Sequence, residues 1–532
     1  WFPAHGAEIS LADNTLEHTP PCCCWSPSAS GQTGVPYCFY PKNYAQGYNV
    51  VSSTSTAAGT SASLSLASGT RVPFGNAVPN LDVKVWEETP TRLHFKITDA
   101  AKARWEPPVK TPPPPPAKPV GTEYTYTVKQ APFSIEVARE SSGETLFNST
   151  VGKAGSGFGT LTYSNQYIEF STHLPTNPNI YGLGEHITPL KLDTSGTAGQ
   201  VYTMLARDQG TPVHNQLGNT NLYASQPLYL VLNPEDGATH GVFLLNSNAM
   251  DIVIHSDDDG AFITYRVLGG VLDFYIFTGP SPEAVVQQYL EVIGKPFLPP
   301  YWALGFHLCR WGYMTLQRTQ EVNDNMRAAG LPQDVQWNDI DYMDNHLDFT
   351  SDPTRFPVAA YGQWVNTTLR QHGQHYVPIF DPAISSSQTP GSYPAFDDGL
   401  DQNVFIKNTT GGVFIGSVWP GLTAFPDFFS ANASAYWTQQ MTLWHDKVPF
   451  DSAWIDMNEP SNFCNGQCRK PTPPLDFEEP VAMAQVASTP LPQPPRSALR
   501  GAEAAVPALG DGFDAVFPPF LPGREGGAQL ID

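Results

Sequence analysis

The stretch Trp454-Ile455-Asp456-Met457-Asn458-Glu459 closes a short apolar run with acidic side chains, and this run is the last of four predicted strands. We predict the buried strands at residues 303–309, 334–341, 375–381 and 450–456. Helices are expected between them at residues 315–329, 356–372 and 430–446. Strands that alternate with helices pair in parallel, either in a doubly wound sheet or in a (β/α)8 barrel.

The first of these helices has a clear apolar face. Val322, Met326 and Ala329 recur at helical spacing, and Gly330 is placed to end the helix. Gly373 ends the second predicted helix in the same way.

The chain before this region has a different texture. Short β-branched and aromatic runs, such as residues 124–128, 228–232, 241–245 and 250–254, are separated by Gly, Asn, Pro and Asp. Many short strands at this spacing predict an antiparallel β-sandwich. Residues 106–119 contain five consecutive prolines from Pro112 and predict an exposed polyproline loop.

Composition limits the possible partners. Lys and Arg number 28 against 50 Asp and Glu, which gives a net charge of −22 in 532 residues. This charge disfavours nucleic acid and anionic lipid, whereas a neutral sugar is indifferent to it. No apolar run is long enough to span a membrane, and residues 1–13 show no signal peptide.

Cysteines suggest an oxidising compartment, because six of the seven lie in two local groups. The first group is Cys22, Cys23, Cys24 and Cys38, the second is Cys464 and Cys468, and Cys309 stands alone. Metal binding is the alternative, but no His cluster lies beside either group. Four Asn-x-Ser/Thr sequences are compatible with a glycoprotein, although a long chain contains several by chance: Asn148, Asn366, Asn408 and Asn432.

Acidic residues follow three of the four predicted strands. Asp339 and Asp341 close the second strand, Asp381 the third, and Asp456 and Glu459 the fourth. In a parallel barrel such strand ends meet at one mouth. Tryptophans accompany them, and carboxylates beside flat apolar faces suit a pyranose: Trp311, Trp337, Trp419 and Trp454. The alternative is that these Asp residues only cap the following helices, and Trp337 equally fits plain core packing.

Several of these segments resemble one enzyme family. Residues 454–463 are similar to the signature of the α-glucosidases of glycoside hydrolase family 31. The resemblance extends over residues 20–468, and its further motifs lie at residues 181–186, 241–250, 306–313, 334–343, 381–385, 418–421 and 425–428. Residues 22–25 and 36–39 resemble the end of a P-type trefoil module.

The resemblance implies a multi-domain chain. Residues 1–45 would form a partial trefoil, residues 46–300 an amino-terminal β-sandwich, and residues 301–468 the first half of a (β/α)8 barrel. Residues 469–532 match no family motif and are rich in proline and alanine, so we expect disorder there. The chain would accordingly be a carboxy-terminally truncated member of the family.

Roles for individual residues are also implied by the resemblance. Asp456 falls at the position of the catalytic nucleophile, and Glu459 would assist by positioning Asp456 or shaping its charge. Sugar hydroxyls would be bound by Asp339, Asp381 and a loop residue of the sandwich, Asp208. The wall of the pocket would be formed by Trp311, Ile379, Trp419, Trp454 and Met457.

These roles imply a retaining α-glucosidase that releases terminal glucose from maltose-like oligosaccharides and needs no metal or other cofactor. The acid/base residue is unassigned, because the family supplies it from a later strand. The alternative is a catalytically inactive carbohydrate-binding protein or a non-functional truncated product. Disulfides and the resemblance place the chain in the secretory pathway, in a lysosome or vacuole or outside the cell.

Overall fold

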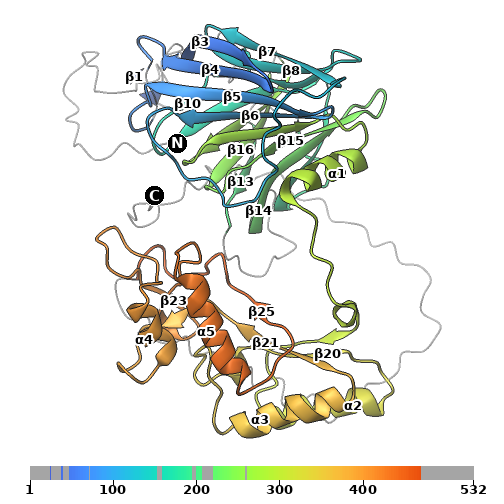
Figure 1. Cartoon of the computed structure of the whole chain (residues 1–532), viewed down its shortest axis with the longest axis vertical. Coiled ribbons are helices and arrows are strands. Elements are labelled where there is room, and N and C mark those ends of the chain that lie inside the picture. The colour runs from blue at the N-terminus through green and yellow to red at the C-terminus, as the bar shows by residue number, and fades with distance from the viewer. Residues whose placement is uncertain are drawn as a thin grey trace, which may run out of the picture. The chain divides into compact units, whose positions relative to one another are not determined.

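The computed structural model describes residues 47–468, except for 71, 73, 153–158, 176, 195–198, 207–219 and 258–259 (Figure 1). It also describes the backbone of two short antiparallel strands, β1 (Cys24–Trp25) and β2 (Cys38–Phe39). The chain divides into two compact units, residues 1–298 and residues 299–532. The predicted trefoil beyond these two strands and the predicted disordered tail lie outside the described residues.

The first unit contains two antiparallel sheets. The strand order of one sheet is β12 (Asn179–Ile187), β14 (Thr220–Leu232), β15 (Thr239–Leu244), β18 (Leu272–Phe277), β6 (Arg92–Asp99), β5 (Asn80–Thr89), β4 (Gly59–Leu66), β3 (Tyr48–Thr56). The order of the other is β13 (Gln200–Met204), β16 (Met250–Asp257), β17 (Gly260–Val267), β11 (Ile168–His173), β9 (Thr145–Asn148), β8 (Phe133–Arg139), β7 (Tyr124–Gln130), and β10 (Thr162–Tyr163) pairs with β11. The predicted antiparallel β-sandwich is confirmed.

Alternation along the strands produces the core between the sheets. In β5, Leu81, Val83 and Val85 are buried, whereas Lys84 between them is exposed. Because successive side chains of a strand point to opposite faces, one face of β5 enters the core and the other meets solvent or loops. In the neighbouring β6, Leu93, Phe95 and Ile97 enter the same core.

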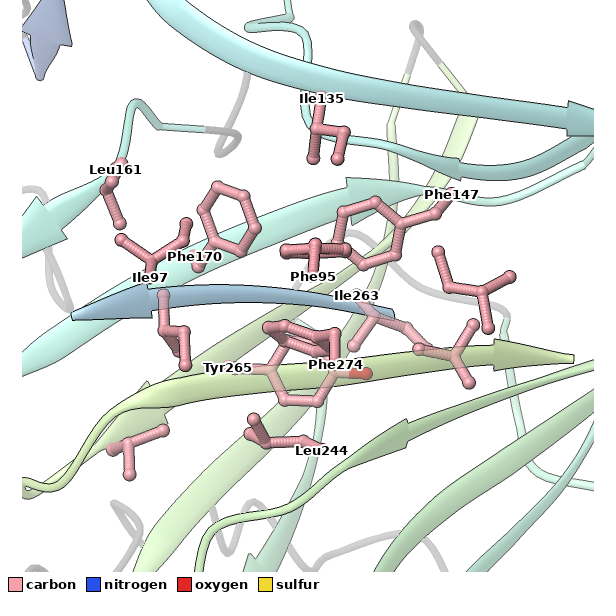
Figure 2. Close-up of a cluster of buried hydrophobic side chains, with 14 of the residues drawn as sticks. Phe95, Ile97, Ile135, Phe147, Leu161, Phe170, Leu244, Ile263, Tyr265 and Phe274 are labelled. Atoms are coloured by element: carbon pink, nitrogen blue, oxygen red, sulfur yellow. The ribbon is translucent and has the colours of Figure 1, made fainter. Parts of the chain in front are cut away.

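Aromatic side chains from both sheets meet at the centre of the sandwich. Figure 2 shows Phe95 of β6 and Phe274 of β18 packed with Phe147 and Phe170 of the opposite sheet. The ring centroids of Phe95 and Phe147 are 5.3 Å apart, and those of Phe147 and Phe274 are 5.4 Å apart. Tilted and edge-on contacts at these distances are the arrangement that aromatic rings prefer.

A helix not predicted from the sequence, α1 (Pro282–Ile293), covers the outer face of β15 and β18. Val285, Tyr289 and Val292 form its buried stripe. Its amino terminus is capped by Ser281, whose side chain accepts a hydrogen bond from the backbone of Ala284 at 3.2 Å.

The polyproline loop is confirmed, since no helix or strand occurs between Asp99 and Tyr124. The loop is attached to the sheet at several points. The side chain of Trp105 donates to Ser247 at 2.9 Å, and Lys118 forms an ion pair with Glu87 at 2.6 Å. Glu106 pairs with Lys96 of β6.

The second unit contains the predicted alternation of strands and helices. Four parallel strands occur in chain order, β19 (His307–Leu308), β20 (Val335–Asn338), β21 (His375–Phe380), β25 (Trp454–Ile455). The helices between them are α2 (Leu316–Ala328), α3 (Val358–Trp364) with a π-helical continuation (Val365–Leu369), and α5 (Ala433–His445). The strand predicted at 303–309 was too long, because Tyr301–Leu304 form a 3-10 turn, and the strand predicted at 450–456 is confined to β25.

The strand order favours a barrel over a doubly wound sheet. A doubly wound sheet reverses its strand order, whereas here each strand lies beside the one before it in the sequence. Leu316 of α2, Tyr361 of α3 and Trp444 of α5 also pack in one cluster with Tyr376 and Phe380 of β21. The helices therefore cover a single face of the sheet, as in a (β/α)8 barrel.

A small subdomain not predicted from the sequence follows β21. It contains α4 (Pro394–Asp401) and a three-stranded antiparallel sheet with the order β22 (Ile384–Ser385), β24 (Gly421–Ala424), β23 (Gly416–Val418). Tyr393, Phe405 and Tyr436 of α5 form its core. The subdomain carries Trp419 immediately after β23.

The cysteine predictions are tested in part. Cys464 and Cys468 form a disulfide, as expected, and Cys309 is a free, exposed thiol. The disulfides expected among the first four cysteines lie outside the described side chains.

Candidate active site

Three of the predicted carboxylates come directly after neighbouring parallel strands. Asp339 follows β20, Asp381 follows β21, and Asp456 follows β25. Because β20 pairs with β21 and β21 with β25, their carboxyl ends lie along one edge of the sheet. The charge of Asp456 raises the pKa values of both Asp339 and Asp381, so the structure brings the three side chains together.

Asp339 combines a capping role with a perturbed acidity. Its side chain accepts a hydrogen bond from the backbone of Ile340 at 2.7 Å, which caps the short 3-10 turn Ile340–Tyr342. Burial, together with the charges of Asp341 and Asp456, nevertheless raises its pKa to about 6. Asp339 therefore makes the capping contact that the alternative expects, but capping does not account for its raised pKa or for the neighbouring carboxylates.

Among the described predicted site residues that titrate, Asp381 is the most enclosed. It is 2% exposed, and its Oδ1 atom has no hydrogen-bond partner among the described residues. Burial raises the pKa of Asp381 well above its usual range, and the charges of Asp456, Asp339 and Glu459 raise it further. A neutral carboxyl group in this position can donate a hydrogen bond as well as accept one.

Asp456 and Glu459 lie at the end of β25 and are both half-buried. Glu459 is close enough to Asp381 to raise its pKa, so it belongs to the same carboxylate group. Met457 between them has a φ of 59°, a left-handed conformation that few non-glycine residues adopt. The backbone thus turns sharply where the proposed nucleophile is held.

Apolar side chains line this edge of the sheet. The indole nitrogen of Trp419 donates to the sulfur of Met457 at 2.8 Å, and the rings of Trp419 and Phe463 are 5.0 Å apart. Trp454 contacts Trp337 at 5.5 Å, and Ile379 is the neighbour of Trp454 in the ladder. Two of the predicted wall residues, Trp419 and Met457, are therefore in direct contact although 38 residues separate them.

Trp311 is 41% exposed and lies in the loop after β19. This loop is held by Asp341, which is buried and accepts the backbone N–H of Met314 at 2.7 Å. Asp341 is therefore an anchor of the loop. Trp337 of β20 is half-buried, and its indole nitrogen donates to Nδ1 of His307 at 3.0 Å.

Asp348 is a site residue that the sequence analysis did not identify. It is fully buried, and its Oδ1 atom accepts the backbone N–H of Asp381 at 2.8 Å. No local pattern distinguishes it from other loop aspartates such as Asp344. The predicted sugar ligand Asp208 lies outside the described residues.

Within the described ranges, no group of His, Cys, Asp and Glu has the arrangement of a metal site. No helix there is long and apolar enough to cross a membrane.

Family models match both units of the chain. Residues 81–252 match the glycosyl hydrolase 31 N-terminal galactose mutarotase-like domain, and residues 296–489 match the glycosyl hydrolases family 31 TIM-barrel domain. Among solved structures, the fold is similar to an ER glucosidase II heterodimeric complex with a TM-score of 0.65 and 21% identity, over 79% of this chain and 53% of that one. The Flavobacterium johnsoniae GH31 dextranase gives a TM-score of 0.61 at 18% identity, over 78% of this chain and 48% of that one. At these identities the structures support the fold alone.

Curated relatives are more similar in sequence. Lysosomal alpha-glucosidase of Bos taurus is 45% identical over 447 residues, which cover 84% of this chain and 45% of that protein. Intestinal sucrase-isomaltase of Homo sapiens is 41% identical over 458 residues, which cover 84% of this chain and 23% of that protein. The chain thus spans less than half the length of these relatives. Since both of its units match domains of the same family, the chain belongs to glycosyl hydrolase family 31.

Proposed function

We propose that this chain binds the terminal glucose of maltose-like α-linked oligosaccharides and carries the nucleophile of a retaining α-glucosidase. The observation that supports this most directly is the group formed by Asp339, Asp381 and Asp456 at one edge of the parallel sheet. The apolar pair of Trp419 and Met457 lies on strand ends of the same unit. Relatives named as alpha-glucosidases support glucose as the sugar.

Each carboxyl group has a distinct chemical task in this proposal. The Asp456 carboxylate attacks the anomeric carbon as the bond to the leaving oxygen breaks, and water later hydrolyses the resulting glucosyl ester. Asp339 and Asp381 bind sugar hydroxyls, which donate hydrogen bonds to their carboxyl oxygens. Glu459 contributes negative charge beside them, which favours the cationic character of the transition state.

Retention requires a second carboxyl group about 5–5.5 Å from the nucleophile, which protonates the leaving oxygen. The family supplies this acid from a later strand of the barrel, so we assign it to no residue here. A chain that binds sugar without this acid would be a carbohydrate-binding protein.

We also propose a secretory-pathway location, either lysosome, vacuole or extracellular space. The disulfide between Cys464 and Cys468 and the lysosomal relatives support it.

The experiment measures binding and hydrolysis separately on the purified chain. Calorimetry with glucose and maltose reports binding, and release of glucose from maltose or from an aryl α-glucoside reports turnover. Asp456→Asn should retain binding within about threefold but lower hydrolysis by about 10⁴-fold or more, the scale expected when a nucleophile is removed. Asp446→Asn, at an exposed position after α5, is the matched control and should change neither quantity.

Peptide mapping after treatment with a mechanism-based glucosyl inactivator identifies the nucleophile directly. A label on Asp456 supports the assignment, and a label on another side chain would overturn it. Sugar binding without any hydrolysis would favour the carbohydrate-binding alternative. Absence of both, in a sample shown to be folded, would refute the proposed function.

A further inference from the structure

The buried pair of Asp348 and Asp381 has an unusual environment. Asp348 lies in the loop after the turn Ile340–Tyr342 and is fully buried. Its Oδ1 atom accepts the backbone N–H of Asp381 at 2.8 Å, across 33 residues of sequence. Its backbone oxygen accepts the hydroxyl of Tyr393 at 3.1 Å. Asp348 therefore joins the end of β21 to the subdomain that carries Trp419.

One oxygen of each carboxyl group has no hydrogen-bond donor. Oδ2 of Asp348 and Oδ1 of Asp381 are both buried and lack a partner among the described residues. An ionised carboxylate that is buried without a donor or a cation costs several kcal/mol, so one of the two groups is expected to be neutral.

Among the described residues, the groups that face the pair supply no positive charge. Asp339, Asp456 and Glu459 approach Asp381 from the ends of β20 and β25. Tyr342, Tyr393 and Tyr436 of α5 approach Asp348, and all three are phenols. None of the ion pairs found in the described part of the chain includes Asp348 or Asp381.

We propose that Asp348 holds a proton that it shares with Asp381, and that it thereby positions Asp381 for the sugar hydroxyls. This inference rests on the proposed function, because it concerns the same sugar site. Asp348 is a positioning residue, since it acts on the sugar only through Asp381.

Two neighbouring buried carboxyl groups whose charges repel do not both ionise at neutral pH, and one proton held by the pair relieves both the repulsion and the cost of burial. Burial raises the pKa of Asp348 well above its usual range, and the charge of Asp381 raises it further. The neutral group is then Asp348, whose hydroxyl provides the donor that Asp381 lacks. With one oxygen held in this way, the other oxygen of Asp381 is directed to the ligand.

Infrared spectroscopy tests the proton without any sugar. Wild-type chain at neutral pH should show the carbonyl band of protonated carboxyl groups, and Asp348→Asn should lose the share of this band that one carboxyl group contributes. Asp344→Asn, a half-buried aspartate of the same loop, is the matched control and should leave the spectrum unchanged. Identical spectra for wild type and Asp348→Asn would refute the shared proton.

Glucose calorimetry tests the positioning. Asp348→Ala should weaken glucose binding about tenfold, the loss of one hydrogen bond that orients a ligand group. Asp348→Asn should rescue most of this loss, because an amide can accept from the backbone of Asp381 and donate to its carboxylate. Equal weakening by both variants, or no weakening by Asp348→Ala, would refute positioning. If wild type binds no glucose, the proposed function fails, whereas the infrared result still decides whether the proton is present.

Discussion

His94 lies in a buried cluster of charged side chains in the sandwich. Its Nδ1 atom is 2.7 Å from Glu88, and its Nε2 atom is 2.5 Å from Asp273. The ring is stacked on Tyr275 with a centroid distance of 4.0 Å and makes a tilted contact with Trp86 at 4.6 Å. The perturbation that we consider is His94→Gln, which keeps a polar side chain but cannot carry a charge.

The expected magnitude follows from what remains after the substitution. Removing one partner of a buried ion pair costs about 3–5 kcal/mol, because the other charge stays buried. Here Arg92 still contacts Glu88 at 2.8 Å, and Lys96 still contacts Asp273 at 3.3 Å. We therefore expect the free energy of unfolding to fall by about 3 kcal/mol at pH 5, the lower end of that range.

The free energy of unfolding that His94→Gln loses should be larger at low pH than at high pH. Burial alone would lower the pKa of His94, but the hydrogen bonds to Asp273 and Glu88 outweigh it and raise the pKa above 6.5. The stabilisation by the charged ring is therefore complete below pH 6.5 and is lost as the pH rises through the raised pKa. Above the raised pKa of His94 the variant and the wild type should differ only by about 1 kcal/mol, the value of a neutral hydrogen bond.

Urea-dependent hydrogen exchange at the amides of β6 measures this difference at pH 5, 7 and 9, because it reports on the first unit by itself. His372→Gln changes an exposed histidine and should alter stability at none of these pH values. The reasoning is refuted if His94→Gln loses the same free energy at pH 5 and pH 9, since the charge of His94 would then contribute nothing.

Two further changes test the packing and the disulfide. Phe274→Ala, in the aromatic core of Figure 2, should lower the free energy of unfolding of the first unit by about 3–5 kcal/mol. The control is Val286→Ala, on the exposed side of α1, which should lower the free energy of unfolding by less than about 0.5 kcal/mol. Urea-dependent hydrogen exchange at the amides of β6 measures both variants. Replacing Cys464 and Cys468 by Ser should raise hydrogen exchange near residues 457–468 by an amount equivalent to about 2 kcal/mol, since the closed loop is short. An unchanged exchange rate there would contradict a stabilising role for the disulfide.

Regular elements of both units were predictable because their signals are local. Short β-branched and aromatic runs broken by Gly, Asn, Pro and Asp indicated the sandwich strands, and the helical period of Val322 and Met326 indicated α2. The buried residues of α2 are nevertheless Leu316, Thr319 and Asn323, and not the predicted apolar face. The elements that were missed in the second unit are too short to show a period. The strand β22 has two residues, and α4 has eight.

The composition of the candidate site was likewise predictable only in part. Acidic residues at the ends of consecutive strands predicted that Asp339, Asp381 and Asp456 would lie together, because parallel strands end at one edge. The resemblance to the family also predicted Trp419 and Met457 as site residues, but it did not predict the contact between them. Asp348 carried no sequence signal at all.

The sequence by itself thus determined which segments form strands and helices and which carboxylates end the parallel strands. Only the tertiary structure decided which carboxyl groups lose contact with water and which charges face them. Asp348 meets Asp381 across 33 residues, and His94 meets Asp273 across 179. Burial and the electric field at a side chain depend on such distant segments, and no local pattern in the chain records them.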